Sequence, residues 1–444
     1  MQEDSGSGPS RHSNKDEIWL PVIKSLPRSV VVLLFPAVLI IGVLAYTRET
    51  QPTLSGISST KSSLSTTRTF KIPFSVQRET PLNCNVYNLT RTCPTNQDPI
   101  KEDDQSRPSG ATCPDYFRWI EEDLRPWAYT GITQEMVERA KQPPPLFRYC
   151  GNDDTLDIVF PDWSFWGWAE VNIKPWEILL GELKKGNERI PWLNREPYAY
   201  WKGNPSVAET REDLMKCNVS QNQEWNARLY AQNWKRESEE GFKKSELASQ
   251  CTHRYKVYIE GSAWSVSEKY ILACDSATLL VKPHYYDFFS RGLIPGHHYW
   301  PIKEDDKCRS IKFAVDWGNS HNQRAHQIGK AGSEFIQEEL KMDFVYDYMF
   351  HLLNAYAKLF TYKPSISGNA TELCVESMVC GAEGLEKKFM MESLVKGPAD
   401  TDPCTMPAPF DPPSLYAQLQ RKKSSIQQIE SWERSYWENQ NITS

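Results

Sequence analysis

The segment YKVYIEGSAWSVSEKYILACDSATLLVK, residues 255–282, constrains the fold of this chain more than any other stretch. Its β-branched run at 257–259 predicts a buried strand that stops at the following glycine. Ser265 stands three residues before Glu268, a spacing typical of a capping box, so we expect a helix over 265–274. The run TLLV then predicts the next strand. The segment is therefore a compact strand–helix–strand unit, which indicates an α/β fold.

The turn between the first strand and the helix is a candidate phosphate site. Such a turn presents backbone N–H groups without helical partners, together with the positive end of a helix dipole. One turn into the helix, a lysine can add a full positive charge. The predicted phosphate contacts are Ser262, Ala263, Trp264, Ser265, Val266, Ser267 and Lys269. A capped helix after a strand is also common as plain scaffold, so the pattern alone does not establish a site.

Five motifs along the chain carry a resemblance to a known family. In order they are CPDYF (113–117), IVFPDWSFWGW (158–168), YAYWKGNP (198–205), the unit above and KMDFVYDYMF (341–350). They resemble the CAP10-type protein O-glucosyltransferases, or Rumi-like glycosyltransferases, and look most like the plant branch. The resemblance covers about residues 113–364. It implies a GT-B fold of two Rossmann-type domains that transfers a sugar from a UDP donor with inversion and without a metal.

An uncharged run of 18 residues, 29–46, is about the minimum length that spans a bilayer. Lys15, Lys24 and Arg28 precede the run and only Arg48 closely follows it, so the preceding tail is expected to be cytoplasmic. A cleaved signal peptide fits poorly, because a long polar stretch precedes the run and no small-residue cleavage pattern follows it. We expect an uncleaved type II anchor with a lumenal catalytic part. The chain ends without an ER retention tetrapeptide, which favours the Golgi over the ER.

Cysteines and sequons agree with a lumenal location. All 11 cysteines follow the apolar run, and an oxidising lumen permits disulfides. Cys251 precedes the first strand of the unit and Cys274 ends its helix, so both lie at one end; the family resemblance supports this bridge. The odd total leaves at least one thiol unpaired within the chain. Glycosylation sequons begin at Asn88, Asn218, Asn369 and Asn441.

Composition divides the chain into six parts. They are a cytoplasmic tail (1–28), the anchor (29–46), a flexible Ser/Thr/Pro-rich stem (47–112), a truncated N-terminal Rossmann-like part (113–197), a C-terminal UDP-sugar-binding Rossmann-like domain (198–364) and a C-terminal tail (365–444). The C-terminal domain ends in an amphipathic helix with Phe344, Tyr348, Leu352, Tyr356 and Phe360 near one face. A net charge of −6 does not favour binding to nucleic acid, which needs a basic surface.

Lys202 and Gly203 follow the predicted strand 198–201 and are a second candidate phosphate contact. A cation at a strand end beside a glycine can approach a phosphate closely, although a solvated surface lysine is the alternative. The resemblance places Arg–Gly at this point, and lysine lacks the bidentate fork of arginine. Family members also often carry an arginine where this chain has Ser267, which weakens one contact to the leaving group.

Aromatic residues in the motif at 158–168 are candidate sugar contacts. The resemblance places this segment near donor and acceptor, and a flat aromatic ring stacks well on the C–H face of a sugar. Trp163 and Trp166 are the candidates for this role. Phe165 and Trp168 are expected to fill the core.

The general base that an inverting transferase needs is the missing part of this sequence. The resemblance places it on an aspartate in an acidic segment of the N-terminal half, between the pieces that meet here at Lys141 and Gln142. This chain has no such segment, and residues 113–199 amount to only 87 positions, fewer than the ~100–150 of a typical domain. We interpret the chain as a shortened form. Asp162 is the one substitute candidate, although its motif suits a role in shaping the pocket.

The leading hypothesis is a glycosyltransferase that moves glucose or xylose from UDP-glucose or UDP-xylose to a hydroxyl of a protein or polysaccharide acceptor. No metal or other cofactor is expected. One alternative is a catalytically inactive shortened form that only binds nucleotide sugar or carbohydrate. Another is a lumenal carbohydrate-binding module built on the tryptophans.

Overall fold

The computed structural model describes residues 82–93, 111–140, 157–395 and 402–443. Within these residues no helix is both long enough and apolar enough to cross a membrane. The predicted anchor at 29–46 lies outside the described residues, as do the tail before it and most of the stem.

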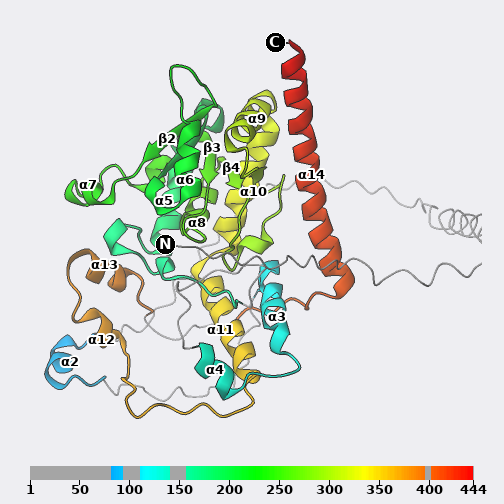
Figure 1. Cartoon of the computed structure of the whole chain (residues 1–444). Coiled ribbons are helices and arrows are strands. Elements are labelled where there is room, and N and C mark those ends of the chain that lie inside the picture. Colours follow the sequence, from blue (N-terminus) through cyan, green and yellow to red (C-terminus); the bar gives the residue numbers. More distant parts are fainter. Residues whose placement is uncertain (1–81, 94–110, 141–156, 396–401, 444) are drawn as a thin grey trace, which may run out of the picture. The chain divides into compact units, whose positions relative to one another are not determined.

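A parallel sheet of five strands forms the framework of the described residues (Figure 1). The strands are β1 (Glu196–Gly203), β2 (Ala227–Ala231), β3 (His253–Tyr258), β4 (Ala277–Val281) and β5 (Trp300–Ile302). They are hydrogen-bonded in the order β2-β1-β3-β4-β5, and every pairing is parallel. This is the order of a doubly wound sheet, so the α/β class and the three predicted strands are confirmed.

Helices cover both faces of the sheet, which explains why its strands are apolar on both sides. They are α8 (Ser267–Leu272), α9 (Lys307–Ser320) and α10 (Asn322–Glu339). Leu279 of β4 packs in a core with residues of α9 and α10. The next residue, Leu280, points to the other face and packs against Ile271 of α8. Alternate side chains of one strand therefore serve two different cores.

Two glycines in helix interiors have opposite surroundings and give a matched test of this packing. At Gly329 of α10, a Cβ atom would lie 2.5 Å from the Asp275 carbonyl oxygen and 2.7 Å from the Ala277 nitrogen. At Gly181 of α5 (Trp176–Glu188), it would meet nothing within 4 Å. We expect Gly329→Ala to lower the free energy of unfolding by about 1–3 kcal/mol and Gly181→Ala to raise it by about 0.5–1 kcal/mol. Urea unfolding measures both, and a Gly329→Ala variant as stable as the parent would contradict the close approach.

The part predicted as a truncated Rossmann-like domain contributes helices, where the structure describes it. They are α3 (Trp119–Leu124), α4 (Gln134–Ala140), α5 and the short 3₁₀ turns η1 (Asp115–Arg118), η2 (Arg125–Trp127), η3 (Trp163–Phe165), η4 (Ala169–Val171) and η5 (Trp192–Asn194). Phe117 and Trp176 are buried in one core with Tyr348 of α11 (Met342–Lys358). The described residues therefore hold one Rossmann-type sheet and not the predicted pair.

Helix α11 is the predicted amphipathic helix. Its Tyr348 and Leu352 are buried, as expected. Phe360, however, lies beyond the end of the helix and forms a bridge with Ile132.

Disulfides correct the predicted boundaries of stem and tail. The described residues contain the pairs Cys84–Cys380, Cys93–Cys374, Cys113–Cys404, Cys217–Cys308 and Cys251–Cys274. The last pair confirms the predicted bridge. The first two join helix α2 (Cys84–Thr90) and the residues just after it to the region of α12 (Val375–Val379), so residues 82–93 are not part of a free linker. The eleventh cysteine, Cys150, lies outside the described residues.

The predicted tail is an integral part of the fold. It contains α13 (Gly384–Glu392) and the long helix α14 (Pro412–Thr443). Ile429 of α14 is buried in the core on the α9 side of the sheet. The rings of Trp317 and Trp432 are stacked between α9 and α14.

The four sequons lie in different environments. Asn88 and Asn369 are exposed, and Asn441 lies in the last turn of α14. The side-chain amide of Asn218 instead donates to the Leu229 carbonyl (3.1 Å) and accepts from the Leu229 N–H (2.9 Å). Asn218 therefore helps to hold β2 in place, and glycosylation stays a prediction.

Candidate functional site

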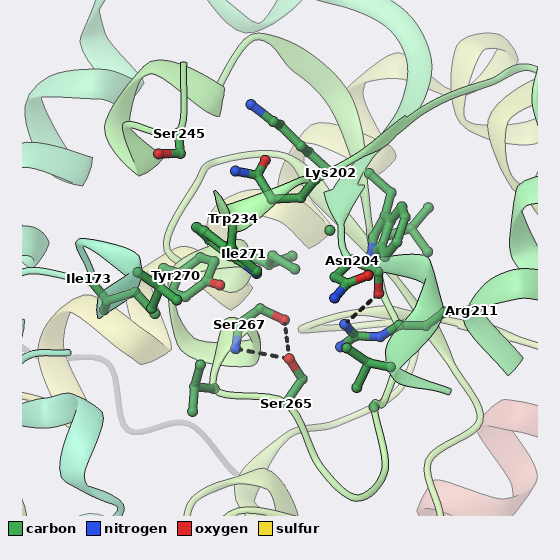
Figure 2. Close-up of a pocket in the computed structure, with 18 of the residues that line it drawn as sticks. Ile173, Lys202, Asn204, Arg211, Trp234, Ser245, Ser265, Ser267, Tyr270 and Ile271 are labelled. Carbon is green, nitrogen blue, oxygen red and sulfur yellow. Dashed lines mark hydrogen bonds between the residues drawn. The ribbon is translucent and has the colours of Figure 1, made fainter. Parts of the chain in front are cut away.

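The candidate site lies where β1 and β3 end. In this strand order, the connections leave these two neighbouring strands toward opposite faces, so a crevice opens outside their carboxyl ends. A cavity of about 370 Å³ lies here, lined by residues that follow both strands (Figure 2). The predicted contacts Lys202, Gly203 and 262–267 all line it. The predicted contact Lys269 does not.

The turn after β3 makes few hydrogen bonds of its own. The N–H of Gly261 donates to the Ala263 carbonyl (2.8 Å), and that of Ser265 to the Tyr258 hydroxyl (3.0 Å). Within the described part of the chain, the N–H groups of residues 262–264 donate to no acceptor. Such free donors in a concave turn are suited to an anion.

Helix α8 begins two residues later than predicted and ends at Leu272. The predicted capping box is wrong, because the Glu268 carboxylate turns inward and accepts a hydrogen bond from Ser290 Oγ (2.8 Å). The hydroxyls of Ser265 and Ser267 lie 2.9 Å apart instead (Figure 2). With only six residues, α8 supplies less of a dipole than the sequence argument assumed.

Arg211 is a cavity cation that sequence reasoning missed. It lies on α6 (Glu209–Leu214), and its side chain in the cavity wall is buried. Nε donates to the Glu260 carbonyl (2.7 Å), Nη2 to that of Ile259 (3.2 Å) and Nη1 to that of Asn204 (3.4 Å; Figure 2). Burial lowers the pKa of Arg211, but a guanidinium stays charged.

No carboxylate forms an ion pair with this guanidinium among the described residues. The residues that line the cavity are also unbalanced in charge. Of the described residues that line it, Lys202, Arg211 and Lys256 are basic and none is acidic. A buried charge without a partner is costly, so the cavity is suited to an anionic ligand.

Lys202 lines the cavity from its other end. Its ammonium donates to the Lys244 carbonyl and lies 3.6 Å from a carboxylate oxygen of Glu237. In Figure 2 this side chain points away from Ser265 and Ser267. The adjacent Gly203 cannot carry a side chain, since a Cβ atom would lie 2.5 Å from the indole of Trp201.

Lys269 and Asp162 lie outside the cavity, which corrects both predictions. Lys269 is buried; its ammonium donates to Ser164 Oγ (2.5 Å) and lies 3.5 Å from Asp162 Oδ2. It also lies over the ring of Phe165. Asp162 is 0% exposed and accepts from the Ser164 N–H (2.6 Å). A carboxylate so enclosed cannot take a proton from an acceptor, and Lys269 cannot contact a phosphate in the cavity.

Three buried carboxylates, Asp162, Glu268 and Asp287, surround the single ammonium of Lys269. Burial raises the pKa of Glu268 to about 7. Burial raises the pKa of Asp287 as well, and the charge of Asp162 raises it further. The cluster therefore holds protons that the unfolded chain would release.

This cluster predicts that stability falls as pH rises from about 4.5 to 7. In that interval the folded state keeps the proton of Glu268 while the unfolded state loses it. The contribution of this proton to the free energy of unfolding is therefore fully present below pH 4.5 and lost as the pH rises above 7. We expect the free energy of unfolding to fall by up to about 3 kcal/mol for this group. Glu268→Gln should flatten the profile, whereas Glu334→Gln at an exposed site should not. Urea unfolding at several pH values tests this, and an unchanged slope in Glu268→Gln would refute it.

The tryptophans that line the cavity are not the pair that the sequence predicted as sugar contacts. Trp163 is 44% exposed and meets Trp168 edge to face at 5.5 Å, and both line the cavity. Trp168 was expected in the core. Trp166 does not line the cavity, because its indole N–H donates to the Tyr346 hydroxyl (2.9 Å). Phe165 is buried in the core, as predicted.

Comparison with known proteins gives matches over the same region. The model of "Glycosyl transferase family 90" matches residues 108–143 and 139–433. The two matched stretches meet at 139–143, where the sequence suggests a missing segment.

Three similar proteins are O-glucosyltransferases by name. Human Protein O-glucosyltransferase 1 is 26% identical over 234 residues, covering 49% of this chain and 58% of that protein. O-glucosyltransferase rumi of Drosophila melanogaster is 24% identical over 234 residues, covering 49% and 56%. The rumi homolog of Anopheles gambiae is 26% identical over 238 residues, covering 50% and 58%. The chain thus spans less than three fifths of the length of these relatives.

The family match includes all five strands of the sheet and every residue that lines the cavity. It also confirms the resemblance to Rumi-like O-glucosyltransferases that the motifs suggested. This chain therefore belongs to glycosyl transferase family 90.

Proposed function

We propose that this protein binds a UDP-sugar in the cavity at the ends of β1 and β3 and transfers its glucose or xylose to a hydroxyl. A protein acceptor has support from the names of the similar proteins, and a polysaccharide is the other candidate. The observation that carries the proposal is the unbalanced charge of the cavity, where Arg211 lacks an acidic partner among the described residues.

On this proposal, the diphosphate of the donor lies between Arg211 and the free N–H groups of residues 262–264. As the bond from the anomeric carbon to the phosphate oxygen breaks, negative charge grows on the departing UDP. Fixed donors around that charge lower the barrier, because they need little reorganisation. Lys202 adds positive charge from the far end of the cavity. The side chains thus supply the charge stabilisation that a metal-independent, inverting transfer needs.

The sugar then packs against the half-exposed indole of Trp163, with Trp168 behind it. This position faces solvent, where an acceptor hydroxyl can arrive. No acidic residue lines the cavity among the described ones, so the general base is not Asp162. We propose that another carboxylate, outside the described residues that line the cavity, takes the proton of the acceptor hydroxyl as the sugar is transferred.

We further propose that residues 29–46 anchor the protein in the Golgi membrane with the cavity on the lumenal side. The disulfides of the described region support an oxidising compartment.

Calorimetry of the full-length chain with UDP, UDP-glucose and UDP-xylose tests donor binding, with ADP-glucose as control. We expect UDP and at least one UDP-sugar to bind with micromolar affinity and ADP-glucose to bind far more weakly. No heat at millimolar UDP would contradict the proposal. Release of UDP from a bound UDP-sugar, in the presence of an acceptor protein, then separates a transferase from a form that only binds the donor.

A further inference from the structure

We propose that Lys256 identifies the nucleobase of the donor by donating a hydrogen bond to O4 of uracil, the oxygen that cytosine replaces with an amino group, and so selects UDP over CDP. The inference rests on the proposed function, because it requires a nucleotide in the same cavity.

Lys256 lies deep in the cavity. Its Cα is in register with that of Tyr200 on β1, three residues before the strand ends at Gly203. Three residues of a strand span about 10 Å, so Lys256 stands well behind the diphosphate contacts at the strand ends. Its side chain is 3% exposed. Trp163, at 44%, marks the open side of the cavity instead.

This difference in exposure indicates which end of the cavity holds the sugar and which holds the base. The sugar must meet an acceptor that arrives from solvent, so it belongs on the open side near Trp163. The base is attached to the other end of the diphosphate and takes no part in the reaction. It therefore occupies the closed end, where Lys256 is.

Two buried donors at the cavity lack good acceptors. The contact of the Lys256 ammonium is Cys274 Sγ at 3.4 Å, and sulfur is a weak acceptor. The side-chain nitrogen of Gln232, a buried residue, has no hydrogen-bond partner within the described part of the chain. Both residues line the cavity. Burial and the nearby charge of Arg195 lower the pKa of Lys256 to about 7, as expected where no anion balances it.

Unmatched donors select a ligand that presents acceptors. Uracil carries two carbonyl oxygens on its pairing edge, whereas cytosine replaces one of them with an amino group. An ammonium facing that amino group would leave two donors without partners in a buried site, which is costly. A site built to bond one polar group discriminates strongly against an analogue that lacks it. The closed end thus matches uracil better than cytosine.

Calorimetry of the full-length chain with UDP and CDP tests the assignment in three forms: the parent, Lys256→Met and the exposed control Lys216→Met. In the parent and in Lys216→Met, we expect UDP to bind at least about tenfold more tightly than CDP, or about 1.4 kcal/mol. In Lys256→Met, UDP should weaken until the two affinities are nearly equal. A parent that does not discriminate, or a folded Lys256→Met variant that keeps the full preference, would overturn the assignment.

A measurement on the parent alone covers the case in which Lys256→Met does not fold. Replacing O4 of UDP by sulfur weakens the acceptor without changing the ring, so 4-thio-UDP should bind at least about threefold more weakly than UDP. Equal binding would overturn the role of Lys256 but leave the proposed function standing. If neither UDP nor CDP binds the parent, both the proposed function and this inference fail.

Discussion

Arg211→Ala is expected to weaken UDP binding by about 30- to 100-fold. Hydrogen bonds to a charged group contribute about 1.5–3 kcal/mol, and among the described residues this guanidinium has only carbonyl partners in the wall of the cavity. Calorimetry with UDP measures the loss. Lys202→Ala should cost less, because that ammonium already lies near Glu237 and points away from the turn.

Two further variants control this prediction. Arg211→Lys keeps the charge but loses the planar fork, so its affinity should lie between those of the parent and Arg211→Ala. Arg236→Ala removes an exposed arginine outside the cavity and should bind UDP as the parent does. Thermal unfolding shows whether each variant is folded. A folded Arg211→Ala protein with the affinity of the parent would place the diphosphate elsewhere.

Lys269→Met is expected to lower the free energy of unfolding by about 3–5 kcal/mol while leaving the UDP affinity of the folded protein unchanged. Removing one partner of a buried ion pair strands the opposite charge, and here Asp162 is 0% exposed. Urea unfolding measures the stability, with Lys341→Met as the exposed control.

A second substitution shows whether the stranded charge is the cause. Asp162→Asn should restore part of the stability in the Lys269→Met background, because it removes the unpaired carboxylate while keeping an acceptor for the Ser164 N–H. A stable Lys269→Met protein that has lost UDP binding would instead favour the phosphate role expected from sequence.

Sequence patterns predicted β1, β3 and β4, because a strand that is covered on both faces is a short run of apolar residues. They did not predict β2 and β5. The position of Lys269 along its helix was also predictable. Its direction was not, since the rotation of α8 about its axis is decided by packing with segments distant in sequence, such as Ser164.

The sequence did not predict Arg211 as a site residue, because the surrounding residues, ETREDL, are typical of a solvated helix. Only the fold brings α6 against the carbonyl groups that follow β1 and β3. For the stem, composition predicted a free linker. Cys84 and Cys93 were the contrary signal, because cysteines in an oxidising compartment tend to be paired.

Hydrogen–deuterium exchange of the full-length chain with and without saturating UDP tests the central assignment most directly. Bound UDP should protect the backbone of residues 199–211 and 260–272, which enclose the cavity. The region around β5 and α14 should exchange as before. Protection confined to that second region, or no protection at all, would contradict a diphosphate site at the ends of β1 and β3.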